Sequence, residues 1–69
     1  MAPYLEDTLK LVARQGRLTA AELVEERYLR TDAASNRLNR LHGLRLLRRE
    51  AINTQNGLMH VYHFWQWAV

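Results

Sequence analysis

The sequence predicts an α+β domain in which three helices precede a β-hairpin. Apolar residues recur at helical spacing in three segments of the first two thirds of the chain. The composition then changes, because residues 46–52 and 58–65 are both rich in β-forming side chains. The Asn56-Gly57 pair between these runs is typical of a hairpin turn. With 69 residues the chain is long enough for one small domain, which we expect to cover residues 1–69.

Composition favours a folded protein with one basic face. The chain has no cysteine, which excludes disulfides and thiolate zinc sites and is compatible with the cytoplasm. We expect a soluble cytoplasmic protein without a membrane partner, because no apolar run approaches the roughly 20 residues of a membrane span. The net charge is +3, and residues 37–49 contain five arginines and no acid. This stretch favours nucleic-acid binding, with an ordinary solvated basic surface as the alternative.

The first helix is expected over residues 3–15. Leu5, Leu9 and Val12 recur at helical spacing and form an apolar stripe, while most charged residues lie off it. Pro3 suits the first turn, where its missing N–H has no partner to lose. A short extended link at residues 17–18 follows and can pair as a minor strand.

A second helix begins at Ala20 and is capped on its amino-terminal side. Thr19 supplies a hydroxyl at the N-cap position, and Glu22, three residues later, completes a capping box. The helix is expected to end near Arg27 or Tyr28. Its few residues make it a short element that connects directly to the next helix.

The third helix starts at Thr31 or Asp32, either of which can act as its N-cap. Apolar spacing continues past Gly43, so we place the functional part of the helix at residues 31–44 and its end at Arg45. The stripe expected to be buried contains Ala34, Leu38, Leu41 and Leu44. The opposite side contains Asn36, Arg37 and Arg40.

A capped helix, a tight connection and a second helix with a polar outer face form the layout of a helix-turn-helix. In this motif the second helix presents polar side chains to a DNA groove. A structural helix has no need for two arginines and an asparagine on its outer side. The sequence therefore indicates a DNA-recognition helix.

The hairpin is expected to pack on the helices, because an isolated hairpin of this length is only marginally stable in water. Alternation along the second strand puts Tyr62 and Phe64 on the core face. Val61, Trp65 and Trp67 share the other face. These three residues either cover the core beside the first helix or form an interface with another protein.

Three motifs resemble those of winged helix-turn-helix domains. MarR-type and ArsR-type regulators and the short regulators of fimbrial operons typically show L-T-x-x-E-L-A, S-R-x-L-x-x-L-x-x-x-G-L-V-x-R and V-x-Y-x-L. The counterparts in this chain are LTAAELV at residues 18–24, SNRLNRLHGLRLLRR at 35–49 and VYHF at 61–64. The resemblance implies a winged helix-turn-helix with three helices and a C-terminal β-hairpin wing, and it implies transcription regulation through DNA binding.

Three positions depart from the pattern. Arg27 and Tyr28 replace the usual leucine and glycine at the corner between the two helices, so the corner must be built differently; Tyr28 folding into the core is one way. Arg45 replaces the glycine that usually follows the recognition helix and must either adopt a left-handed conformation or let the helix end earlier. The wing tip, residues 54–57, has no arginine.

The candidate DNA contacts follow from these elements. Asn36, Arg37 and Arg40 would enter the major groove, where arginine suits guanine and asparagine suits adenine. Arg37→Ala and Arg40→Ala are therefore each expected to weaken specific binding. Thr31, Ser35 and the backbone amides at the helix start would hold phosphates. Arg48 and Arg49 point to opposite faces of the first strand, so only one of them would face the duplex. The side-chain amides of the wing tip would contact phosphates or base edges. The full set is Thr31, Asp32, Ala33, Ser35, Asn36, Arg37, Arg40, Arg48, Arg49, Gln55 and Asn56.

Catalysis and metal binding are not expected. His60 and His63 lie on opposite faces of a strand, and no cysteine or acid cluster joins them. The sequence shows no nucleophile with a base, no paired carboxylates and no glycine-rich phosphate loop. We therefore predict a protein that is not an enzyme and uses no cofactor.

The predicted function is sequence-specific binding of double-stranded DNA by a small transcription regulator. Its partners would be double-stranded DNA and either a second copy in a homodimer or another DNA-bound protein, as the resemblance to fimbrial regulators implies. The alternative is a winged-helix protein-interaction module that docks through Val61, Trp65 and Trp67. An RNA-binding winged helix fits the charge but lacks an aromatic platform beside the arginines.

Overall fold

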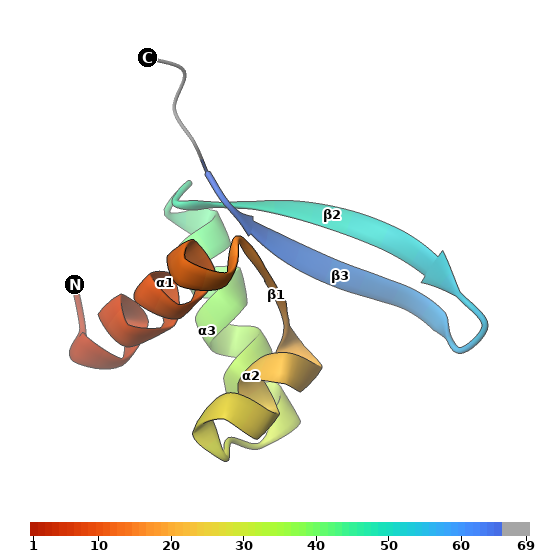
Figure 1. The fold of residues 1–69 in the computed structure, drawn as a ribbon, viewed down its shortest axis with the longest axis horizontal. Helices are drawn as coiled ribbons and strands as arrows, with labels where there is room; N and C mark the ends of the chain where they lie inside the picture. Colours follow the sequence, from red (N-terminus) through yellow and green to blue (C-terminus); the bar gives the residue numbers. More distant parts are fainter. Residues whose placement is uncertain (66–69) are drawn as a thin grey trace.

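The computed structural model describes residues 1–65 as three helices and a three-stranded antiparallel sheet (Figure 1). The elements are α1 (Pro3–Gln15), β1 (Arg17–Thr19), α2 (Ala20–Arg27), α3 (Thr31–Gly43), β2 (Leu47–Thr54) and β3 (Gly57–Phe64). Strand β3 lies in the centre of the sheet, between β1 and β2. The predicted α+β winged-helix arrangement is confirmed, including the minor strand after α1.

The core lies where the three helices meet the base of the sheet. Helix α1 contributes Leu5, Leu11 and Val12, all buried, while the predicted stripe residue Leu9 is only partly buried. Buried Thr8 donates its hydroxyl to the Tyr4 carbonyl at 2.8 Å, which satisfies its polar group. No helix in residues 1–65 has the length and apolar character needed to cross a membrane.

The capping box predicted for α2 is confirmed. The Glu22 N–H donates to the Thr19 hydroxyl at 3.2 Å, and the Thr19 N–H donates to a Glu22 carboxylate oxygen at 2.9 Å. These two bonds satisfy backbone donors that have no partner within the helix. They fix where α2 begins, directly after β1.

The corner between α2 and α3 differs from the expectation that Tyr28 enters the core. Tyr28 is 94% exposed and has a left-handed backbone with φ of 53°. Leu29 packs against the core instead, and its N–H donates to the Val24 carbonyl at 3.1 Å. The left-handed backbone at Tyr28 changes the direction of the chain after α2, so that the tyrosine side chain points to solvent and the next side chain, Leu29, points to the core.

Arg27 connects this corner to α1. Its Nε and Nη2 donate to the two carboxylate oxygens of Asp7, at 2.7 and 3.1 Å. These hydrogen bonds, with the nearby charges of Arg27, Arg37 and Arg14, lower the pKa of Asp7 despite partial burial, which acts in the opposite direction. The ion pair of Arg27 with Asp7 thus replaces the apolar contact expected from the leucine that is usual at position 27.

The prediction that Thr31 or Asp32 caps the amino-terminal end of α3 is wrong. Arg30 is the N-cap residue and makes no side-chain capping bond. Its carbonyl accepts the Ala34 N–H at 3.0 Å, so Thr31 is already the first helical residue. The Asp32 carboxylate accepts the adjacent Ala33 N–H at 3.0 Å instead.

The carboxyl-terminal end of α3 lies at Gly43, so the predicted end at Arg45 is wrong. Arg45 has φ of 63° and donates its N–H to the His42 carbonyl at 2.9 Å. The Leu46 N–H donates to the Leu41 carbonyl at 3.0 Å, which completes a Schellman motif. This turn leaves Leu44 55% exposed, whereas Leu47 takes the place in the core that Leu44 was expected to fill.

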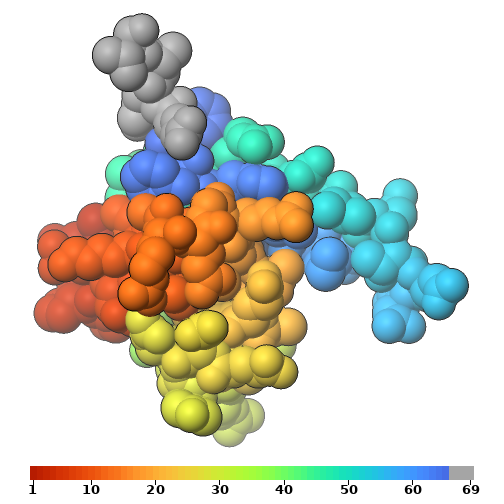
Figure 2. Space-filling model, in the orientation of Figure 1, coloured from red at the N-terminus to blue at the C-terminus, as the bar shows by residue number. Residues whose placement is uncertain are grey.

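Strands β2 and β3 form the predicted hairpin, which projects away from the helices (Figures 1 and 2). Thr54 pairs with Gly57, so Gln55 and Asn56 are the two loop residues. Gly57 has φ of 112°, whereas Asn56 keeps a negative φ. The Asn-Gly pair therefore marks the turn correctly, although only its glycine needs a conformation that other residues rarely adopt.

The sheet register separates two faces. Leu18 of β1, Tyr62 of β3 and Arg49 of β2 are aligned on the face toward the helices. Val61 lies on the opposite face, paired with Thr19 and Glu50 in the neighbouring strands, and is only 4% exposed. Of the two alternatives predicted for Val61, its burial agrees with a covering role, and Val61 itself adds almost nothing to an exposed docking surface.

The neighbouring aromatic residues Phe64 and Trp65 are both partly exposed. Phe64, predicted to lie in the core, is 38% exposed because it lies at the end of the sheet, paired with Leu47. Trp65 is equally exposed. Trp67 lies outside the described residues.

Candidate nucleic-acid interface

The side of α3 that faces away from the core is polar and exposed. The buried stripe of Ala34, Leu38 and Leu41 is confirmed, since all three are fully buried. Exposed residues on the other side are Thr31, Asp32, Asn36, Asn39 and Arg40, with Ser35 and Ala33 at its partly buried margins. The outer side of α3 therefore presents hydroxyl, amide and guanidinium groups together with the Asp32 carboxylate.

Arg37 does not belong to this outer side, contrary to expectation. It is half-buried, and its guanidinium carbon lies 5.0 Å from the centre of the Tyr4 ring on α1. Its charge also contributes to the lowered pKa of Asp7. Because Arg37 comes three residues after buried Ala34, it borders the apolar stripe, and its long side chain reaches the neighbouring helix. Arg37 therefore joins α3 to α1.

The two arginines of β2 lie on opposite faces of the sheet, as expected from strand alternation. Arg49 is on the face toward the helices and donates Nη1 to the Asn39 amide oxygen at 3.1 Å. Arg48 pairs with His63 and lies on the other face. Arg49 is thus the arginine of this pair that shares a side of the molecule with the outer face of α3.

Asn39 is a functional candidate that the sequence reasoning missed. Its side-chain oxygen accepts hydrogen bonds from Arg49 and from the Tyr62 hydroxyl, the latter at 2.5 Å. Tyr62 is a core residue of β3, so Asn39 connects α3 to the hairpin. Asn39 comes three residues after Asn36 and four after Ser35, so helical spacing places it on the same side of α3 as these two residues. That spacing could have identified Asn39 as a candidate from the sequence.

A groove lined by both polar and apolar residues lies between the hairpin and the helices. Its volume is about 400 Å³. The helices contribute Thr19, Ala20, Ala21, Ser35 and Asn39, and the hairpin contributes Thr54, Asn56, Leu58, Met59, His60 and Tyr62. Hydroxyl, amide and imidazole groups along this groove can bond phosphate oxygens.

The wing tip is ordered by its own hydrogen bonds. The Thr54 hydroxyl donates to the Gly57 carbonyl at 2.8 Å and accepts the Asn56 N–H at 3.2 Å. Gln55 and Asn56 are exposed at the far end of the hairpin. Their amide groups are available to a ligand that lies along the wing.

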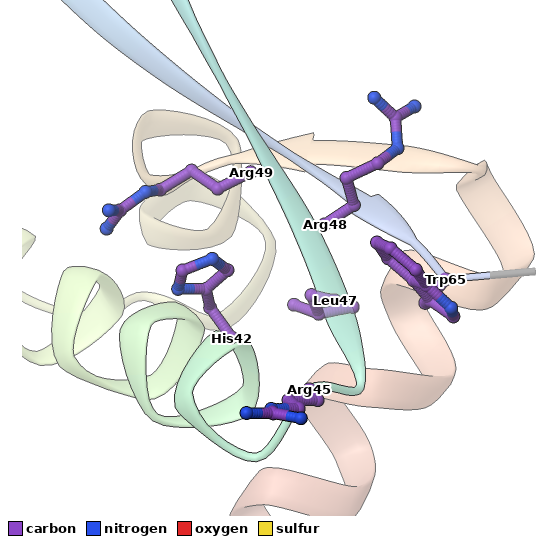
Figure 3. Close-up of a pocket in the computed structure, with 6 residues that line it drawn as sticks. All are labelled: His42, Arg45, Leu47, Arg48, Arg49 and Trp65. Atoms are coloured by element: carbon purple, nitrogen blue, oxygen red, sulfur yellow. The ribbon is translucent and has the colours of Figure 1, made fainter.

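A second cleft, of about 450 Å³, lies at the end of α3. It is lined by His42, Arg45, Leu47, Arg48, Arg49 and Trp65 (Figure 3). In Figure 3 the guanidinium groups of Arg48 and Arg49 point away from each other, on opposite sides of β2. Arg48 and Arg49 therefore do not converge on one ligand.

The histidines show no arrangement typical of a metal site. His63 Nε2 lies 3.0 Å from a Glu50 carboxylate oxygen on the outer face of the sheet. His60 lies on the other face, as strand alternation predicts. Within residues 1–65 there is no group of three or more histidine, cysteine, aspartate or glutamate residues that could hold a metal ion.

A comparison of the sequence with protein families gives a match that agrees with this order of helices and strands. The model of the MarR family matches residues 7–54, from the first turns of α1 to the end of β2.

The chain belongs to the MarR family. MarR proteins are DNA-binding transcription regulators that typically bind as dimers, and the family is not enzymatic. The match confirms the MarR-type resemblance of the sequence motifs. The chain matches no curated protein and no solved structure closely enough to show relatedness.

Proposed function

We propose that this MarR-family chain is a transcription regulator that binds duplex DNA sequence-specifically through the outer face of α3. The observation that carries the proposal is the row of exposed Asn36, Asn39 and Arg40 on this face, beside the groove between the hairpin and the helices. An α-helix fits the major groove of B-DNA, and amide and guanidinium groups bond the base edges there. The hairpin would then lie over the adjacent backbone.

The individual side chains have different tasks in this arrangement. Asn36 and Arg40 would contact base edges, whereas Thr31 and Ser35 would bond phosphates near the helix start. Arg49 would contribute a positive charge from the wing side. Gln55 and Asn56 would reach phosphates or base edges at the wing tip. Arg37 is left out of the base contacts because it packs on Tyr4.

Arg40→Ala tests the position of the recognition helix. A bidentate arginine contact to guanine contributes about 1–3 kcal/mol of discrimination, so affinity for a selected site should fall by about 10- to 100-fold. The measurement is a gel shift or fluorescence titration against a duplex selected from a random library. Binding to random duplex should change much less.

Arg14→Ala is the matched control, because it removes the same charge from the exposed last turn of α1. This variant should keep nearly all specific affinity. Equal losses in the two variants would show that overall charge, and not the face of α3, determines binding. A palindromic selected motif would further indicate that two copies bind symmetrically.

A further inference from the structure

We infer that Asn39 is a specificity-determining residue that recognises guanine and rejects adenine. The inference rests on the proposed function, since it concerns which base the outer face of α3 prefers. Its basis is the hydrogen-bond network that joins Asn39 to Arg49 and Tyr62. The chemistry of these partners determines which end of the amide is available to DNA.

Arg49 identifies the amide atom that faces it. A guanidinium group has donors only, so the Asn39 atom 3.1 Å from Arg49 Nη1 must be the oxygen. The Tyr62 hydroxyl contacts the same oxygen at 2.5 Å. A carbonyl oxygen cannot donate, so the tyrosine must be the donor in this second bond.

The amide oxygen of Asn39 is therefore fully used within the protein. A carbonyl oxygen has two lone pairs, and the two donors occupy both. What remains for a ligand is the Nδ2 amide group of an exposed side chain, with its two N–H donors. Asn39 thus offers hydrogen-bond donors and no acceptor.

This chemistry selects between purines in the major groove. Bidentate recognition of adenine needs the amide oxygen to accept from N6 while the amide nitrogen donates to N7. Guanine presents only acceptors, O6 and N7, on the same edge. The donor-only amide can bond both acceptors of guanine, whereas on adenine it can bond only N7 and meets the N6 amino donor with an N–H of its own. The positive charge of Arg49 beside it favours the acceptor-rich edge of guanine as well.

The network is rigid because Tyr62 is held by the core. Its ring is only 2% exposed and meets the His42 ring edge-on, with centroids 6.5 Å apart. Strand β3 is hydrogen-bonded on both edges. The hydroxyl position is therefore fixed by buried structure, which holds the amide in one orientation before any ligand binds.

Asn36 provides an internal contrast. It lies on the same side of α3, and within residues 1–65 its side chain makes no hydrogen bond. Its amide can therefore turn to match either purine, including adenine in the bidentate mode. The two asparagines should consequently prefer different bases.

The experiment selects duplexes from a random library with the full chain and with Asn39→Ala. The parent should prefer a G·C pair at one position where Asn39→Ala shows no preference. Replacing that guanine by 7-deazaguanine, which lacks the N7 acceptor, should weaken the parent by about five- to tenfold. The same replacement should leave Asn39→Ala unchanged, and the parent measurement needs no variant to fold.

A second variant tests the cause of the preference. Tyr62→Phe combined with Arg49→Met keeps the ring and most of the side-chain length but frees the amide oxygen. Adenine should then be accepted at the same position. Tyr4→Phe, which removes a hydroxyl on α1, is the control and should keep the guanine preference; thermal melting checks that each variant folds.

The outcomes separate the inference from the proposed function. If Asn39→Ala keeps the parent motif, or relaxes a position where the parent selects adenine, the inference is wrong while α3 still binds DNA. If the double variant still rejects adenine, the hydrogen-bond network is not the cause and the inference also fails. If the parent retains no duplex at low salt, the proposed function fails together with it.

Discussion

Tyr62 shows how a single residue serves both the core and the candidate site. Alternation along the strand was enough to predict that its ring is buried, and the structure confirms this. The hydrogen bond from its hydroxyl to Asn39 spans 23 positions of the sequence. No local pattern encodes a contact of that separation, because it depends on how the hairpin packs against α3. The contact of Asn39 with Tyr62 could not be predicted for this reason, although helical spacing could have placed Asn39 on the outer side of α3.

The Asp7–Arg27 pair makes folding stability depend on pH. Hydrogen bonds from Arg27 lower the pKa of Asp7 from its ordinary value of 3.8. The unfolded chain therefore binds a proton at a pH where the folded chain does not. The contribution of the Asp7–Arg27 pair to folding stability is thus present above about pH 3.8 and is lost as the pH falls through the pKa of Asp7 in the folded chain. Solvent screening keeps it small, since the Asp7 side chain is 47% exposed.

Asp7→Asn should thus lower the free energy of unfolding at neutral pH and should flatten its decline in acid. Urea unfolding at a series of pH values between neutrality and 3 measures both effects. Glu25→Gln is a suitable control, because Glu25 is an exposed acid of α2. An unchanged acid profile for Asp7→Asn would mean that the pair does not contribute to stability.

At the scale of elements, helix boundaries differed in how well they could be predicted. The start of α2 was predicted correctly because Thr19 and Glu22 form a local, two-residue motif. The end of α3 was placed too late because apolar spacing continues to Leu44, which the structure leaves exposed. A left-handed turn at Arg45 redirects the chain there, and spacing alone does not reveal a change of backbone conformation.

Tyr28→Gly should stabilise the protein, because the left-handed conformation at this position is strained for a residue with a Cβ atom. That strain is about 1–2 kcal/mol, and the added freedom of glycine in the unfolded chain offsets part of it, so the net gain should be about 0.5–1 kcal/mol. The tyrosine side chain is 94% exposed, so its removal should cost little packing. Urea unfolding at neutral pH measures the difference.

Tyr28→Ala separates backbone strain from side-chain effects. Alanine removes the ring but keeps the Cβ atom, so this variant should show no comparable gain. Similar stability of the glycine and alanine variants would contradict the assignment of strain to the backbone at the α2–α3 corner.

At the scale of the whole molecule, the hairpin and the helices enclose the groove beside α3. The order of elements was predictable from the sequence because each helix and strand has its own periodicity. The position of Arg37 over Tyr4 was not, since it depends on the crossing of α1 and α3. The sheet adds a division of charge, with Arg49 toward the helices and Arg48 on the far face.

This division of charge predicts different salt dependences for two neighbouring arginines. Each phosphate neutralised by the protein contributes about −0.9 to the slope of log affinity against log salt for B-DNA. Arg49→Met should therefore reduce the magnitude of the slope measured with random duplex by about 0.9. Arg48→Met removes the same charge one residue earlier and should leave the slope nearly unchanged, because its side chain lies on the far face of the sheet.

Random duplex is the appropriate probe, since it reports phosphate contacts without the base contacts of Asn39. Equal slopes for the two variants would mean that the side of the sheet facing the helices does not lie against the duplex, and the orientation proposed for the wing would have to be abandoned.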